Sequence, residues 1–261
     1  MITFTPFNHE HMQNLFSKIF QTTVPFDFST VKVDLHSHLL PGIDDGAKDI
    51  ADSLQLIRGL QALGYQKLIT TPHVYQEFYS NTHADIRNGL SKVRVALAEA
   101  GLDIEIEAAA EYFIDEHFEA LLEVDELLTF GDNHVLVETS FFAEPPGLED
   151  IFFRLRTKGY RPILAHPERY GYLARDPERF ERFREMGVQL QLNALSLIGH
   201  YGPDVKKLAR QLLQNRQYDF LGTDLHHRAH LEKLQKVNWP KELTGYPFKN
   251  MELFAKVSEK V

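Results

Sequence analysis

Residues 33–49 read Val-Asp-Leu-His-Ser-His-Leu-Leu-Pro-Gly-Ile-Asp-Asp-Gly-Ala-Lys-Asp. The β-branched and apolar residues over 30–35 predict a buried strand, which ends at His36 and His38 just before a Pro-Gly break. Because alternate residues of an extended chain point to the same face, both imidazoles can reach one cation, with Asp44 or Asp45 returning from the turn. The stretch therefore predicts a metal site where a strand ends.

The rest of the chain repeats one unit, in which a short run of Val, Ile or Leu precedes a polar residue and then a helical pattern. Strands are expected at 30–35, 67–71, 103–110, 135–137, 162–165, 188–192 and 218–222. Helices are expected at 49–63, 85–100, 117–122, 148–157, 177–186, 204–214, 231–237 and 250–257. This alternation predicts a parallel α/β architecture. Polar candidates follow nearly every strand, which favours a closed or nearly closed barrel over an open sheet with one switch point.

Length and composition set further bounds. With 261 residues and 43% hydrophobic content, the chain suits one large α/β domain or two small ones. The formal net charge of −9 disfavours a nucleic-acid groove. The absence of cysteine excludes a cysteine-nucleophile enzyme and a thiolate zinc site. Without a long apolar run or a secretory signal pattern, we expect a cytoplasmic protein with no stable membrane insertion.

Residues 1–30 are treated as an N-terminal extension and residues 31–261 as the barrel domain. The extension is rich in phenylalanine, and residues 11–20 predict a short amphipathic helix. We expect it to pack on the barrel rather than on a membrane. A contact within a homo-oligomer remains open.

The residues at the strand ends form a mixed set of imidazoles and carboxylates: His36, His38, Asp45, His73, Glu111, Glu138, His166, Asp224 and His226. Such a set suits two divalent ions, or three that share bridging carboxylates, and Mn²⁺, Fe²⁺ and Zn²⁺ all fit by ligand type. Taken alone, His73 could be a loop residue, and Glu111 or Glu138 a salt-bridge partner. Eight other histidines, at 9, 11, 83, 117, 134, 200, 227 and 230, are expected to be mostly exposed, with His227 and His230 left open.

A family resemblance rests on six stretches in chain order. DLHSHLLPGIDDGAKD, TTPH, EYF, VLVE, AHPERY and GTDLHH resemble the PHP (polymerase and histidinol phosphatase) superfamily over about residues 31–230. The first and fifth stretches resemble its bacterial capsule-type protein tyrosine phosphatases. The resemblance implies a distorted (β/α)₇ TIM-like barrel, with the nine residues above holding two or three metal ions, manganese first among them.

The resemblance also implies an activity, which is hydrolysis of phosphotyrosine by metal-activated hydroxide. The implied partner is the phosphotyrosine tail of a bacterial tyrosine autokinase that controls capsule or exopolysaccharide synthesis. Arg169 matches a phosphate-binding arginine of the family, whereas a salt bridge to Glu168 or Asp176 is its alternative role. Arg228 is the candidate for a second catalytic arginine, although the following Ala-His-Leu departs from the family's usual stretch. His227 is a candidate for the general acid.

Three rival functions remain. A histidinol phosphate phosphatase or other small-molecule phosphomonoesterase would need a deep pocket with an acidic group for the amine. A metal-dependent nuclease is disfavoured by the acidic charge balance and by the lack of a fused polymerase region. A catalytically inactive scaffold ranks last, because every predicted ligand position is filled.

Overall fold

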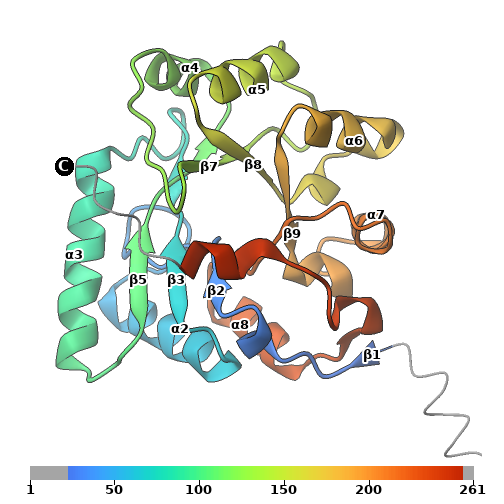
Figure 1. Ribbon diagram of the computed structural model, residues 1–261. Coiled ribbons are helices and arrows are strands. Elements are labelled where there is room, and N and C mark those ends of the chain that lie inside the picture. Colours follow the sequence, from blue (N-terminus) through green and yellow to red (C-terminus); the bar gives the residue numbers. More distant parts are fainter. Residues whose placement is uncertain (1–22, 255–261) are drawn as a thin grey trace, which may run out of the picture.

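The computed structural model describes residues 23–254 of the chain (Figure 1). Its strands are β1 (Thr23–Val24), β2 (Val33–Asp34), β3 (Lys67–Thr70), β4 (His73–Val74), β5 (Glu105–Ala108), β6 (Glu111–Phe113), β7 (His134–Glu138), β8 (Arg161–Ala165), β9 (Gln189–Asn193), β10 (Phe220–Gly222) and β11 (Trp239–Pro240). The α-helices are α2 (Ile50–Leu63), α3 (His83–Glu99), α4 (Glu116–Glu123), α5 (Leu148–Thr157), α6 (Glu178–Glu185), α7 (Pro203–Gln214) and α8 (Arg228–Lys236).

The strands form a distorted parallel barrel with helices around it (Figure 1). Six strands pair in the order β10-β9-β8-β7-β6-β4, and three pair in the order β2-β3-β5. A parallel bridge between Ser37 and Leu225 connects the β2 segment to the β10 segment. The amide of Asp224 donates to the His36 carbonyl at 2.7 Å and reinforces this closure. The expected barrel and its βα alternation are confirmed.

The distortion arises because two strand positions are each broken into two short strands. β3 and β4 are separated by Thr71 and Pro72, and β5 and β6 by Ala109 and Ala110. Pro72 has no amide hydrogen to donate to the ladder, although its carbonyl accepts from Glu111 at 3.0 Å. The strand predicted over 103–110 is confirmed as the shorter β5, but Glu111, expected at the end of that strand, instead begins β6 in the other sheet.

The predicted helices are confirmed with shifts of one to three residues at most ends. Helix α2 shows the local causes, because the Asp49 side chain accepts from the Asp52 amide at its start and Gly64 ends it at φ 108. The helix expected at 250–257 is wrong in its described part, where Lys249–Phe254 forms the 3-10 helix η6. The expected helix at 11–20 lies outside the described residues.

Apolar side chains fill the amino-terminal end of the barrel interior. Buried side chains of Leu136, Ile163, Phe220 and others pack there with Leu253 of η6. The Asn250 amide donates to the carbonyls of Val33 at 2.8 Å and Leu221 at 2.7 Å. Helix η6 therefore closes this end, and polar groups gather at the opposite, carboxyl ends of the strands.

The short segment before the barrel is also packed. Strand β1 pairs with β11, and Phe28 is buried against Tyr65 and Trp239. Within residues 23–254, no helix is both long and apolar enough to cross a membrane.

His134 is buried, so the expectation that it is exposed was wrong. It is the first residue of β7 and lies between the rings of Phe130 and Phe220, at centroid distances of 5.8 Å and 5.7 Å. The strand turns this side chain inward toward the barrel core. Burial and the neighbouring Arg161 lower the pKa of His134 to about 4.

This burial predicts a pH-dependent loss of stability. The unfolded chain, with a histidine pKa of about 6.5, binds the proton more tightly than the folded protein, so His134 destabilises the fold as the pH falls from about 6.5 to 4. Between pH 7.5 and pH 5, the free energy of unfolding should fall by about 2 kcal/mol less in His134→Gln than in the wild type. Urea unfolding at the two pH values measures this difference, and an identical pH dependence in both proteins would contradict it.

Candidate metal centre

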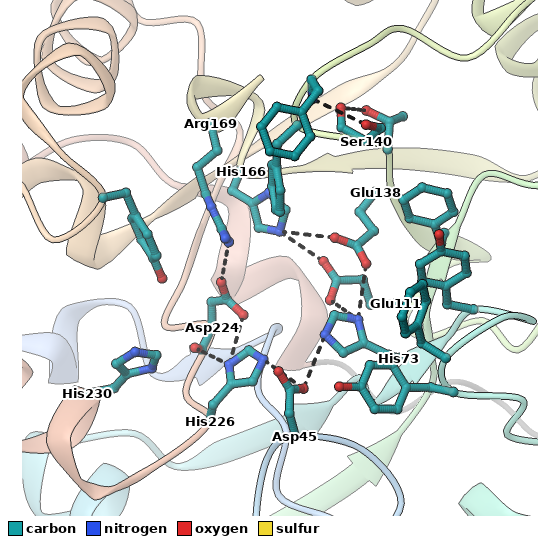
Figure 2. A pocket seen from close by; sticks show the side chains of 18 of the residues that line it. Asp45, His73, Glu111, Glu138, Ser140, His166, Arg169, Asp224, His226 and His230 are labelled. Carbon is teal, nitrogen blue, oxygen red and sulfur yellow. Dashed lines mark hydrogen bonds and ion pairs between the residues drawn. The ribbon is translucent and has the colours of Figure 1, made fainter. Parts of the chain in front are cut away.

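The nine predicted ligands come from loops and strand ends around one end of the barrel. Seven of them line one cavity (Figure 2), and the other two, His36 and His38, are fully buried against Glu111. Two of them have positive φ values: His166, directly after β8, at 32°, and Asp224, two residues after β10, at 51°. The left-handed region is unfavourable for residues with a side chain, and such strain is common at functional sites. The chain accepts this conformation where it turns both side chains into the cavity.

Glu111 lies at the centre of the first cluster, which contains His36, His38, Glu111 and Asp224. The Oε2 atom of Glu111 is 3.1 Å from His36 Nε2 and 3.4 Å from His38 Nε2. Asp224 Oδ1 is 3.3 Å and 3.5 Å from the same two nitrogens. All four side chains are almost fully buried, so they share a space with little access to water.

Two further clusters share members with the first. One contains His38, Asp45, His73 and His226, and the other contains His73, Glu111 and Glu138. His73 Nδ1 is 3.1 Å from both Glu111 Oε2 and Glu138 Oε1, while its Nε2 is 3.5 Å from Asp45 Oδ1. The shared residues make the three clusters one continuous centre.

His166 completes this centre from the side of β8. Its Nε2 lies 3.0 Å from Glu111 Oε1 and 3.9 Å from Glu138 Oε2. The structure thus brings together all nine residues expected from the sequence. Of the two aspartates left open in the turn, Asp45 faces the clusters, whereas Asp44 binds the far nitrogen of His38.

The charges of the centre do not balance without added cations. Burial and His38 lower the pKa of His73, but Glu111 and Glu138 outweigh them and raise it to about 10. Burial and the same His38 lower the pKa of His226 to about 4. The carboxylates therefore demand positive charge, while the imidazoles lie too close together for all of them to be protonated.

Three buried atoms support the fit to metal ions. Glu111 Oε2 and His73 Nδ1 make ion-pair contacts within the centre but no hydrogen bond of regular geometry, and His166 Nδ1 has no hydrogen-bond partner among the described residues. Buried polar atoms normally have a partner, and two of these three belong to the shared members of the clusters. Imidazole and carboxylate donors together suit Mn²⁺, Fe²⁺ or Zn²⁺, so the residues fit a centre of divalent ions.

Further polar side chains orient the candidate ligands by bonding to the atoms that do not face the clusters. Gln191 Oε1 lies 2.8 Å from His36 Nδ1, and Asp44 Oδ2 lies 2.8 Å from His38 Nδ1. The side-chain amide of Asn193 donates to Asp224 Oδ2 at 2.7 Å. Gln191 has no sequence signal beyond its polar side chain inside a buried strand.

A close approach fixes the turn after His38. A Cβ atom at Gly46 would lie 2.2 Å from the carbonyl oxygen of His38, so no larger residue fits without displacing the backbone. The amide of Gly46 donates to Asp44 Oδ1 at 3.0 Å. This contact positions the Asp44 carboxylate, which in turn orients His38.

Arg169 lies beside the centre, where its Nη1 donates to Asp224 Oδ2 at 3.0 Å. Its guanidinium is between the rings of Phe141 and Tyr201, at 4.4 Å and 4.2 Å from their centroids. The alternative pairing with Glu168 is not present. Glu168 is buried and accepts instead from the backbone amide of Asn193 and from the Tyr218 hydroxyl.

Arg228 is not brought into the cavity. It is the first residue of α8, its side chain is 67% exposed, and its Nε donates to Glu232 at 3.0 Å. His227 and His230, the histidines left open, both line the cavity, with ring centroids 3.9 Å apart. His230 is buried and His227 exposed.

The cavity has a volume of about 560 Å³ and two chemically different sides. Arg169, Tyr201 and His230 line the side formed after β8, β9 and β10. The loops after β4, β6 and β7 provide aromatic residues instead, among them Tyr75, Phe113 and Phe142. Among the described lining residues, Arg169 is the one arginine or lysine.

The fold and the site define an α/β barrel with a candidate metal centre at the carboxyl ends of its strands. A family model described as capsular polysaccharide synthesis, CpsB/CapC, matches residues 32–236. Because this match spans most of the chain, the protein belongs to the CpsB/CapC family, as the resemblance predicted.

Individual relatives agree with this assignment. Tyrosine-protein phosphatase YwqE of Bacillus subtilis is 31% identical over 196 residues, which cover 75% of this chain and 77% of that protein. Putative tyrosine-protein phosphatase CapC of Staphylococcus aureus is 26% identical over 195 residues, covering 74% and 76%. A solved structure from work on B. subtilis YwqE and Streptococcus pneumoniae CpsB, described as unique metal-dependent tyrosine phosphatases, has a TM-score of 0.71 at 30% identity, covering 76% of this chain and 81% of that one.

The Gln191 contact predicts an effect on metal affinity. Gln191→Leu removes the acceptor that fixes the His36 ring, and loss of such an outer partner typically costs 10- to 100-fold in affinity. Titration of chelator-treated protein with Mn²⁺ in a calorimeter should show about that loss. Gln189→Leu, at the start of the same strand, is the matched control and should bind Mn²⁺ like the wild type. Equal affinities for both variants would rule out the orienting role.

Proposed function

We propose that the protein is a metal-dependent protein tyrosine phosphatase. The observation that carries this proposal is the meeting of nine strand-end imidazoles and carboxylates beside Arg169, in a cavity with an aromatic side. A phosphate monoester carries negative charge that repels a nucleophile, so its hydrolysis requires clustered cations and an activated water. An aromatic leaving group requires an apolar surface beside those cations. The cavity offers ligands for such cations and aromatic side chains beside those ligands.

Two or three divalent ions would be held by the nine residues, with Mn²⁺ as our first choice and Fe²⁺ or Zn²⁺ as alternatives. When bound, these ions supply positive charge and lower the pKa of water. The charge count supports more than one ion. Asp45, Glu111, Glu138 and Asp224 place four carboxylates in the clusters, and a single divalent ion together with Arg169 would leave net negative charge among neutral imidazole ligands.

Arg169 is proposed to bind the phosphoryl oxygens of the substrate. In the structure its Nη1 pairs with Asp224, and the rings of Phe141 and Tyr201 hold its guanidinium plane. A planar guanidinium can donate two parallel hydrogen bonds to a phosphate. Asp224 therefore positions the donors of Arg169 before the substrate binds. The guanidinium then loses little conformational freedom when it stabilises the charge of the transition state.

The leaving group requires modest assistance. Free tyrosine has a pKa of about 10, so tyrosinate leaves more readily than an alkoxide. The rings on the other side of the cavity from Arg169 would receive the phenyl group. For the partner we propose the phosphotyrosine tail of a bacterial tyrosine kinase involved in capsule or exopolysaccharide synthesis, and the cytoplasm as the compartment where the two meet.

Phosphate release from three substrates tests this function directly. With added Mn²⁺, a phosphotyrosine peptide should be hydrolysed at least tenfold faster than a phosphoserine peptide or histidinol phosphate, because only the first has an aromatic leaving group. A chelator should abolish the reaction, and renewed Mn²⁺ should restore it. A preference for histidinol phosphate would replace the substrate class, and activity that is insensitive to chelation would contradict the metal-dependent proposal.

Arginine variants supply the matched control for this assay. Arg169→Ala should lower kcat/KM for the phosphotyrosine peptide about 100-fold, which is typical for loss of a positioned charged donor. Arg228→Ala removes an exposed arginine that pairs with Glu232, and we expect little change. An equal loss in both variants would place Arg228 in the reaction as well.

A further inference from the structure

The entrance of the cavity carries two aromatic side chains that point into solvent. Phe78 is 66% exposed and Phe142 is 87% exposed, and both line the cavity. Only four phenylalanines of the described chain are counted among its exposed large hydrophobic residues, and these are two of them. Exposed apolar residues are normal when scattered singly, but here two of them flank the opening above the candidate metal centre.

The loop that carries Phe142 is held in place by its neighbours. The Ser140 hydroxyl accepts from the amides of Phe142 at 3.2 Å and Ala143 at 3.5 Å. Glu144 forms a two-pronged ion pair with Arg179, one contact of which is 2.6 Å between Nη2 and Oε1. Phe141 packs inward on Tyr170, with centroids 5.8 Å apart. The adjacent Phe142 is therefore presented to solvent by a braced loop.

The loop that carries Phe78 is a tight turn that is also braced. Tyr75 and Tyr79 bond to each other through their backbones, with N to O distances of 3.0 Å and 2.7 Å. The Tyr75 ring stacks on Phe113 at 4.0 Å, and the Tyr79 ring stacks on His73 at 5.3 Å. Phe78 lies 4.9 Å from the Tyr75 ring and extends this aromatic surface outward.

Exposure increases from the floor of the cavity to its entrance. Glu111 on the floor is fully buried, the Tyr75 and Phe113 pair is half-buried, and Phe78 and Phe142 are exposed. A small aryl phosphate with its phosphoryl group at the floor would be covered by the half-buried pair. Only a substrate that continues out of the cavity on both sides of the phosphotyrosine can cover the two outer rings.

We propose that Phe78 and Phe142 are specificity-determining residues that bind the polypeptide flanking the phosphotyrosine, with a preference for apolar neighbours. The inference rests on the proposed function and adds which side chains contact the residues on either side of the phosphotyrosine and which kind of neighbour they favour. Two carboxylates, Glu77 and Asp115, lie close to the Tyr75 side of the entrance, and Asp115 accepts from the Gln76 amide at 3.3 Å. Acidic neighbours of the phosphotyrosine are therefore disfavoured by like charge.

Hydrolysis of two substrates by single variants tests this role. Phe78→Ala and Phe142→Ala should each lower kcat/KM about 5- to 20-fold for a phosphotyrosine peptide with apolar neighbours, the usual range for losing one aromatic contact. The loss for p-nitrophenyl phosphate should be at least fivefold smaller, because that ester has no flanking residues. Phe153→Ala, which removes a 63% exposed phenylalanine on α5, is the matched control and should leave both rates unchanged.

Two outcomes would overturn the inference. An unchanged peptide rate in both variants would show that the outer rings bind no part of the substrate. An equal loss for peptide and small ester would mean that the rings act on the ester or on the fold, not on flanking residues.

A binding measurement separates this inference from the proposed function. Fluorescence anisotropy of a labelled peptide that carries a non-hydrolysable phosphonate analogue of phosphotyrosine reports binding without turnover. If binding weakens 5- to 20-fold in Phe142→Ala and the protein hydrolyses none of the test esters, the proposed phosphatase activity is contradicted and the peptide site is supported. Unchanged binding would remove the peptide site while leaving the phosphatase intact.

Discussion

The structure depends on one buried carboxylate surrounded by imidazoles. Glu111 has its two oxygens 3.0 to 3.4 Å from nitrogens of four histidines, two from the segment after β2, one from β4 and one from the end of β8. A buried carboxylate among buried imidazoles is costly unless opposite charge is placed precisely where the donors converge. Divalent cations satisfy this requirement, which is why we regard the fold as a scaffold that holds a metal centre.

The barrel is distorted where this carboxylate must reach the centre. The break at Ala109 and Ala110 ends one strand and starts another, so that Glu111 enters the sheet beside β7. The matching break at Pro72 places His73 opposite Glu111 in register. An unbroken ladder would present alternate residues at fixed spacing. The interruptions thus allow two adjacent strands to direct their ligands to a common point.

Much of this arrangement could be predicted from the sequence because the signals are local. Apolar runs followed by polar residues gave the strand ends. Eight of the nine candidates form the three clusters, and His166 contacts them through Glu111. Contacts between distant segments left no such signal. The pairing of Gln191 with His36 spans 155 residues, and the burial of His134 depends on Phe220. Arg228, by contrast, pairs locally with Glu232 four residues later on α8, away from the cavity. The predicted strand ends at residues 71 and 110 lie close to the two breaks, but no local signal shows that His73 and Glu111 then begin new strands in another sheet.

The central claim is that Glu111 and its neighbours bind divalent ions. Its most direct test is the metal content of purified protein that has been incubated with Mn²⁺ and desalted, measured by mass spectrometry for the wild type and for Glu111→Gln. We predict two or three ions per wild-type chain and the loss of at least one in the variant, with an unchanged circular dichroism spectrum. A wild-type chain that retains no metal, or equal metal content in the two proteins, would contradict the account.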